Sequence, residues 1–139
     1  AGPAFHVVAP SLPGHGWSER PAQAGWDIER TADAWAALMG GLCYDRFLVH
    51  GGDWGAVVGT ALARRHPERV AGLHLTMPVS AATDDDRAGA SPSEQRGLAR
   101  EAEYRRTGYG YAQIQRTRPQ TIGYALVDSP AGLCAWLAE

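Results

Sequence analysis

The first half of the chain alternates short apolar runs with longer segments of helical periodicity. The β-branched run at 5–9 and the apolar runs at 46–50 and 70–77 have the length of buried strands. Between them, 28–42 repeats apolar residues three and four positions apart, and 56–65 (AVVGTALARR) is predicted to be a second helix. The order strand, helix, strand, helix, strand predicts a parallel α/β sheet with right-handed crossovers.

Residues near the ends of these segments support their boundaries. Asp27 is placed to cap the first helix, Gly40 and Gly41 can end it, and Pro67 stops the second helix. The Pro- and Gly-rich stretch 10–21 (PSLPGHGWSERP) is expected to form a loop. The first helix is expected to bury one apolar face, made of Ile28, Ala32, Trp35, Leu38, Met39 and Leu42.

The second half has a different composition. Residues 83–97 (TDDDRAGASPSEQRG) are acidic, small and polar, which predicts a linker leading into a helix around 92–106. A mostly helical stretch is expected to follow to the end. We therefore expect residues 1–79 to be the central part of an α/β core and residues 80–139 to be a linker and the start of a helical domain. Because the chain does not open on Met and stops inside a helical pattern, we expect a piece of a longer protein.

Composition excludes several classes of function. The chain has 139 residues and a net charge of −2, so electrostatics give no reason to expect nucleic acid or an anionic membrane as a partner. No apolar run approaches the ~20 residues of a membrane span. All 13 basic residues are Arg, which excludes a lysine-dependent P-loop and Schiff-base chemistry and is typical of a GC-rich bacterial source. Cys43 and Cys134 fit no metal or disulfide spacing, so we expect free thiols in a reducing cytoplasm.

The stretch HGGDWGA, residues 50–56, carries the candidate chemistry. Gly51-x-Asp53-x-Gly55 has the small-x-nucleophile-x-small form of a strand-to-helix nucleophile elbow. Small residues are expected at both flanks because a Cβ beside the nucleophile would clash in so tight a turn. Such a turn places Asp53 at a helix N-terminus, where the helix dipole and the N–H of Trp54 face negative charge.

An aspartate at this position indicates a particular reaction. A carboxylate is ionised at neutral pH and suits attack on an sp³ carbon that carries a leaving oxygen or halide. The product is an ester of Asp53, which water can hydrolyse at its carbonyl. The motif therefore predicts two-step hydrolysis of an epoxide or an alkyl halide. The simpler interpretation is that Asp53 only caps the following helix.

Four blocks in order resemble the epoxide hydrolases of the α/β-hydrolase fold, in particular the microsomal or juvenile-hormone type. Three of them are FHVVAPSLPGHGWSERP, HGGDWGA and HPERVAGLHLTM, and TRPQTIGYALVDSPAGLCAWLAE is similar to the cap domain of that family. The resemblance covers nearly the whole chain except 80–95. It implies a partial α/β-hydrolase fold followed by part of a helical cap. It also implies an enzyme that adds water to a small apolar epoxide to give a vicinal diol, with no metal and no organic cofactor.

The resemblance also assigns roles to individual residues. Asp53 matches the nucleophile, and Trp54 matches the residue whose N–H contributes to the oxyanion site. Tyr111 matches a cap tyrosine that donates a proton to the epoxide oxygen as the ring opens. Tyr109, two residues away, is the alternative register for this role, and Tyr124 is interpreted as a packing residue.

Other parts of the family's machinery are expected outside the chain. The general base His, its acidic partner and the second cap tyrosine should follow residue 139, and a His-Gly-x-Pro loop should precede residue 1. A strand that separates 5–9 from the elbow strand should also precede residue 1, so the chain is expected to fold poorly alone and not to turn over. None of the five histidines is predicted to be the base. Four of them are expected to be satisfied core residues, namely His6, His50, His66 and His74.

Two other functions compete with epoxide hydrolysis. A haloalkane dehalogenase shares an Asp nucleophile followed by Trp, but it holds the halide with a Trp or Asn donor instead of tyrosines. Gly52 and the motif around Tyr111 favour the epoxide. The third hypothesis is a hydrolase fold that survives only as a non-catalytic binding module.

Overall fold

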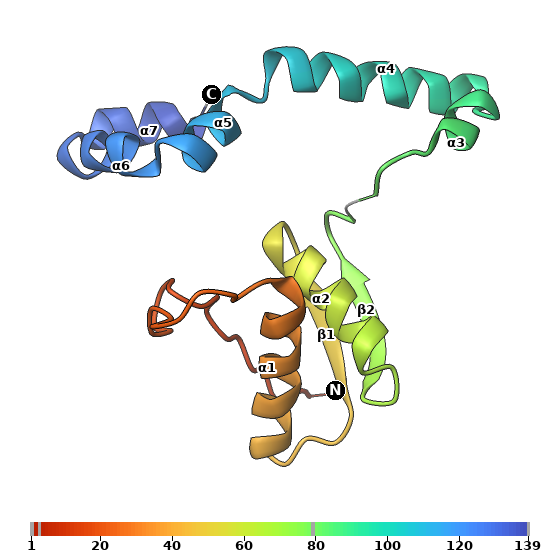
Figure 1. The fold of residues 1–139 in the computed structure, drawn as a ribbon, viewed down its shortest axis with the longest axis vertical. Coiled ribbons are helices and arrows are strands. Elements are labelled where there is room, and N and C mark those ends of the chain that lie inside the picture. Colours follow the sequence, from red (N-terminus) through yellow and green to blue (C-terminus); the bar gives the residue numbers. More distant parts are fainter. Residues whose placement is uncertain (1, 3, 79, 139) are drawn as a thin grey trace. The chain divides into compact units, whose positions relative to one another are not determined.

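The computed structural model describes residue 2, residues 4–78 and residues 80–138. The chain divides into two compact units, Ala1–Ala81 and Ala82–Glu139. The elements of both units are labelled in Figure 1.

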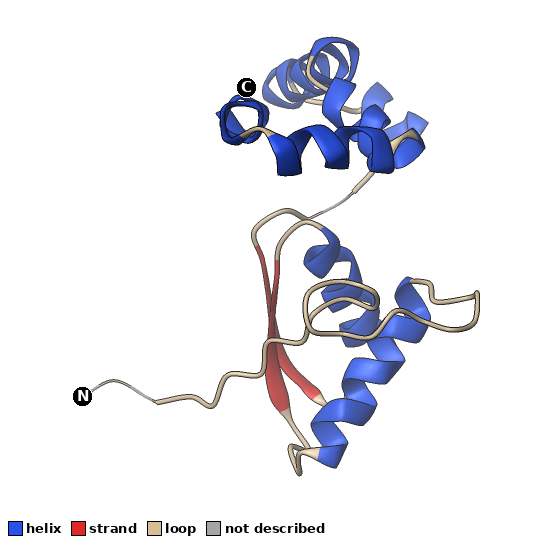
Figure 2. Ribbon diagram, turned by 90° about the vertical axis from the view of Figure 1, so that its left-hand side faces the viewer, coloured by secondary structure: helices blue, strands red, loops and turns tan. Residues whose placement is uncertain are grey.

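The first unit contains a small parallel α/β layer. Its elements are α1 (Ile28–Gly41), β1 (Phe47–Gly51), α2 (Trp54–Arg65) and β2 (Val70–Leu75). The two strands pair in parallel, with Phe47 opposite Val70 and Gly51 opposite Leu75. Both helices lie on one side of the two strands (Figure 2). The predicted parallel α/β arrangement is confirmed for these four elements.

Local hydrogen bonds explain where α1 begins and ends. The Asp27 carboxylate accepts a hydrogen bond of 2.8 Å from the backbone N–H of Arg30, as expected of an N-cap. The last helical residue is Gly41, but the left-handed residue that follows is Cys43, with φ 64°. The Arg69 guanidinium donates to the carbonyls of Ala36 (2.7 Å) and Tyr44 (2.8 Å). Arg69, the residue before β2, therefore bonds one carbonyl within α1 and one in the turn that follows the helix.

Small residues allow α2 to lie close to its neighbours. A Cβ added at Gly59 would meet Val49 Cγ1 at 3.1 Å and Leu73 Cδ1 at 3.5 Å, so the absence of a side chain lets the helix approach both strands. Alanines of α1 pack against the other face of α2 in the same way. The buried cluster is made of Ala32, Ala36, Val58 and Leu62.

The loop before α1 forms the predicted tight turn. Gly14 and Gly16 have φ values of 79° and 51°, which glycine adopts without strain. The Ser18 hydroxyl donates to the carbonyl of Ser11 at 2.6 Å and ties the loop together. A Cβ at Gly16 would lie 2.6 Å from Ser11 Oγ, so this position also needs a residue without a side chain.

The predicted strand at 5–9 is wrong for this structure. The segment is assigned no strand, and Val7 is 85% exposed. A strand requires a neighbour whose backbone groups complete the ladder. Here an open hollow of about 1160 Å³ is lined by residues 4–10 and by residues of α1, β1, α2 and β2. The segment therefore does not pair with β1, as expected if the two are not neighbours in a sheet.

The second unit is entirely helical among the residues described. Its helices are α3 (Asp84–Ala88), α4 (Pro92–Thr107), α5 (Gly110–Thr117), α6 (Pro119–Asp128) and α7 (Pro130–Ala138). Helix α6 packs against α7, and α5 against α6. None of the described residues in these five helices is buried.

Helix α3 lies inside the stretch predicted to be a linker. Capping boxes start both α3 and α4, in which Thr83 pairs with Asp86 and Ser91 with Glu94. Each carboxylate accepts from the backbone N–H of its cap residue at 2.8 Å. The cap hydroxyls, followed by these backbone donors, lower the pKa of Asp86 and of Glu94. The S/T-x-x-D/E pattern was the sequence signal for the helix that the prediction missed.

Little of the chain is removed from water. The accessible surface is 10983 Å², whereas a compact protein of this mass exposes about 7,000 Å². The buried apolar side chains among the described residues are Ala32, Ala36, Ala56, Val58 and Leu62. Burial of apolar surface is the main favourable term in folding, so the described contacts alone supply only a small part of a normal domain's stability.

Candidate active site

The elbow between β1 and α2 holds Asp53 in an unusual backbone conformation. β1 ends at Gly51 and α2 begins at Trp54, so only two residues make the turn. Asp53 has φ 51° and ψ −125°, a combination that costs a residue with a Cβ appreciable free energy. Surrounding contacts must maintain such strain, and strained residues of this kind cluster at functional sites. The Asp53 side chain is exposed.

The geometry contradicts the interpretation of Asp53 as an ordinary helix cap. Its carboxylate makes no capping hydrogen bond to the described residues of α2. Its backbone carbonyl instead accepts from the N–H of Ala56 at 2.9 Å. Asp27, which does cap α1, has the extended backbone of a normal N-cap (φ −94°, ψ −172°). The two aspartates occupy the same position relative to a helix but place their carboxylates differently.

The glycines around Asp53 are not equivalent. A Cβ at Gly51 would overlap the carbonyl group of Gly55, so Gly51 must lack a side chain, as predicted. A Cβ at Gly52 would lie 2.5 Å from Thr76 Oγ1. At Gly55, however, a Cβ would meet no atom of the described residues within 4 Å apart from its chain neighbours and the nearby backbone of α2. The prediction that both flanks must be small is therefore right for Gly51 and wrong for Gly55 in this structure.

Trp54 is the first residue of α2 and follows Asp53 directly. The N–H groups of a first helical turn have no acceptor within the helix, so they can face an anion. Its indole is 61% exposed. Asp53 and Trp54 thus bring a carboxylate and a helix N-terminus to the same turn.

His50 and His74 lie side by side at the ends of β1 and β2, and they are exposed rather than in the core as predicted. Their Nδ1 atoms are 2.8 Å apart and their rings stack at 4.9 Å. One Nδ1 must donate and the other accept, so the two rings adopt different tautomers or charge states. The parallel register, which the sequence pattern does not specify, creates this pair.

The other two histidines predicted to lie in the core also have polar partners. His66 Nε2 lies 2.8 Å from Asp33 Oδ1, and Arg65 contacts both oxygens of the same carboxylate. The hydrogen bonds from Arg65 and then from His66 lower the pKa of Asp33 to about 2. His6 Nδ1 lies 2.6 Å from the Tyr44 hydroxyl and is exposed. His66 is partly buried, so neither residue belongs to an apolar core.

Tyr111 lies on α5 in the second unit, within a cluster of three tyrosines. Its hydroxyl oxygen is 3.2 Å from that of Tyr104 on α4. The Tyr109 ring meets both of the others edge-on, at 6.3 Å from Tyr104 and 6.5 Å from Tyr111. The sequence singled out Tyr111 and its alternative Tyr109, but Tyr104 was missed. The only available signal was its position seven residues before Tyr111.

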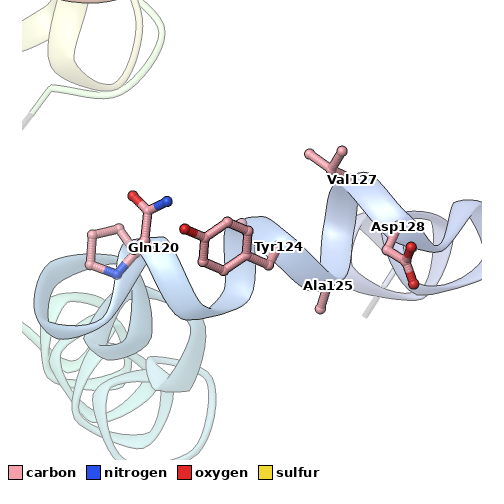
Figure 3. Close-up of a pocket in the computed structure, with 7 residues that line it drawn as sticks. Gln120, Tyr124, Ala125, Val127 and Asp128 are labelled. Atoms are coloured by element: carbon pink, nitrogen blue, oxygen red, sulfur yellow. The ribbon is translucent and has the colours of Figure 1, made fainter.

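Tyr124 does not pack as predicted. It is 70% exposed on α6. It lines a shallow hollow of about 970 Å³ together with Gln120, Val127 and Asp128, all from the same helix (Figure 3). This hollow is lined by neither Asp53 nor Tyr111, so we do not assign the chemistry to it.

Cys43 and Cys134 are free and exposed. No group of three or more His, Cys, Asp or Glu in the described part of the chain is arranged to hold a metal ion. Across the same residues, no helix combines the length and the apolar character needed to cross a bilayer.

The chain belongs to the α/β-hydrolase fold family, because the family's sequence profile matches residues 2–118. It is 50% identical over 136 residues to a Stigmatella aurantiaca protein named "Putative epoxide hydrolase". The aligned residues make up 98% of this chain and 31% of that protein. It is 37% identical to the juvenile hormone epoxide hydrolase of Bombyx mori, over 98% of this chain and 32% of that protein. The crystal structure of the Bombyx mori juvenile hormone epoxide hydrolase matches with a TM-score of 0.75 and 34% identity, over 91% of this chain and 33% of the other. The chain therefore spans about a third of the length of these relatives.

Proposed function

We propose that the full-length protein is an epoxide hydrolase that acts through a covalent ester of Asp53. The observation that carries the proposal is the elbow itself: an exposed carboxylate, held at a positive φ and not engaged in capping, beside a helix N-terminus. The similarity to named epoxide hydrolases supports the choice of an epoxide over other electrophiles.

The first step opens the epoxide. An Asp53 oxygen attacks one ring carbon, the C–O bond to the epoxide oxygen breaks, and its electron pair remains on that oxygen. Tyr111 donates its phenolic proton to the developing alkoxide, which is basic enough to accept it. The product of this step is a hydroxyalkyl ester of Asp53.

The second step regenerates the carboxylate. Water adds to the ester carbonyl, whose developing negative charge can be stabilised by the Trp54 N–H at the start of α2. Collapse of this intermediate releases the diol, whose newly freed oxygen takes one proton of the water, and the other proton of the water restores the Tyr111 phenol. A neutral apolar epoxide is the proposed substrate, and the helices of Ala82–Glu139 are proposed to be the first part of a cap that covers it.

Isotope labelling tests the nucleophile directly. In a single turnover of the full-length protein in heavy-oxygen water, one heavy oxygen should enter the Asp53 side chain, because water attacks the ester at its carbonyl. The Asp27 carboxylate is the matched control, since it caps a helix and should stay unlabelled. Asp53→Asn should reduce diol formation on the order of 10⁴-fold. An unlabelled Asp53 peptide after complete turnover would refute the proposal.

Two further measurements define the reaction and the donor. Diol formation without halide release would exclude the dehalogenase alternative, and turnover of either kind would exclude a mere binding module. Tyr111→Phe should slow ring opening by about 100-fold, the usual contribution of a general acid. Tyr109→Phe should have a small effect, and the reverse result would assign the donor to Tyr109.

A further inference from the structure

Tyr104 lies where it can act on the Tyr111 hydroxyl. Their oxygens are 3.2 Å apart, which is long for a bond between two neutral hydroxyls. Hydrogen bonds to an anionic oxygen are shorter and about twice as strong. The contact should therefore tighten when Tyr111 loses its proton.

Gly108 provides the space for the Tyr104 ring. Gly108 follows α4 as its C-cap and has φ −103°, a conformation open to any residue. A Cβ at this position would lie 2.7 Å from Tyr104 Cδ2 and 2.8 Å from Cε2. The lack of a side chain at Gly108 thus serves the placement of the ring and not the conformation of the backbone.

Building on the proposed function, we propose that Tyr104 is a positioning residue that donates its hydroxyl hydrogen to the Tyr111 oxygen during ring opening. A phenol has one hydrogen to donate and lone pairs to accept. If Tyr104 donates to Tyr111, this contact does not use the Tyr111 hydrogen, which the proposed function requires for the epoxide oxygen. The reverse direction would commit that hydrogen to Tyr104.

The proton balance is simple. Tyr111 gives its proton to the epoxide oxygen as the C–O bond breaks and becomes a phenolate. Tyr104 keeps its own proton and stabilises this phenolate through the hydrogen bond. The proton released when water hydrolyses the Asp53 ester returns to Tyr111. Tyr104 therefore acts on the first step and not on the second.

Rapid-mixing measurements of the two steps in the full-length protein test this role. Tyr104→Phe should slow formation of the ester by about tenfold, the value of one hydrogen bond to a charged group, and leave ester hydrolysis unchanged. Gly108→Ala should have a similar effect because its Cβ displaces the Tyr104 ring, although the hydroxyl is retained. Tyr124→Phe removes an exposed phenol of the same unit and should leave both rates unchanged.

The outcomes separate this inference from the proposed function. If Tyr104→Phe and Gly108→Ala form the ester at the wild-type rate while Tyr111→Phe is about 100-fold slower, the role of Tyr104 is refuted and the proposed function stands. Equal slowing of both steps in Tyr104→Phe would indicate a structural defect and also refute it. If Tyr111→Phe forms the ester at the wild-type rate, the donor assignment of the proposed function fails.

Discussion

The two units of the chain obtain their structure in different ways. In the first unit, α2 packs between α1 and two parallel strands, and a small cluster of side chains is buried. In the second unit, none of the described helical residues is buried. Thr83 and Ser91, with their capping carboxylates, set the starts of α3 and α4. Packing determines the first unit, whereas capping boxes start two of the five helices of the second unit, α3 and α4.

This difference matters for the chemistry assigned to each unit. Asp53 is strained, so it depends on the packing of β1 and α2 to stay in place. The three clustered tyrosines of the second unit, Tyr104, Tyr109 and Tyr111, lie within a stretch of eight residues, so a helix and a turn suffice to bring them together. A strained nucleophile requires a scaffold, but a local cluster of phenols does not.

The largest effect is expected in the buried cluster. Leu62→Ala in the full-length protein should lower the free energy of unfolding by about 2–5 kcal/mol, because it removes buried methyl groups and leaves a cavity. Val127→Ala in the second unit, where the side chain is 90% exposed, should change it by less than about 0.5 kcal/mol. Denaturant unfolding measures both. Equal losses of unfolding free energy in the two variants would show that the second unit also depends on packing around Val127.

The next effect concerns the support of the strained turn. Gly51→Ala should reduce diol formation by about 100-fold, because the new Cβ overlaps the Gly55 carbonyl and must displace the nucleophile. Gly55→Ala should have little effect, since its Cβ would meet open space among the described residues. Steady-state rates, with circular dichroism as a check of folding, distinguish the two. An active Gly51→Ala enzyme would contradict this account of the elbow.

The smallest effect is expected from the ion pair between the helices of the first unit. The pKa of Asp33 is lowered from its ordinary value of 3.8 to about 2, mainly by Arg65. As pH falls, Asp33 therefore becomes protonated in the unfolded chain before it does so in the folded chain. The contribution of the ionised Asp33 carboxylate to the free energy of unfolding is complete above pH 4 and is lost as pH decreases through about 2. Asp33→Asn should flatten this part of the pH dependence of the unfolding midpoint. Arg65→Gln should do so in part, and an unchanged slope in both variants would refute the linkage.

Much of the first unit could be predicted from the sequence. Asp27 marks the start of α1, Pro67 follows the end of α2, and short apolar runs mark β1 and β2, because capping and side-chain periodicity are local properties. The elbow was also recognisable, since a glycine pattern between a strand and a helix reports a tight turn. Within the second unit, α4 was predicted and α3 was missed, although its capping box is equally local.

The errors fall where the answer depends on neighbours. The apolar segment 5–9 has the composition of a strand but no partner to pair with among the described residues. His50 and His74 lie in apolar runs, yet they form an exposed pair because the strand register places them opposite each other. Periodicity shows which side chains share a face, but it does not show what covers that face.

The sequence by itself therefore determined the order of the elements, the position of the elbow and the identity of its carboxylate, because each is encoded by residues close together in the chain. Only the tertiary structure decided that Asp53 is strained and does not cap α2, that Gly51 but not Gly55 needs its missing side chain, and that Tyr104 reaches the Tyr111 hydroxyl. These properties depend on how backbone and side-chain atoms approach one another in space, which no local pattern of residues specifies.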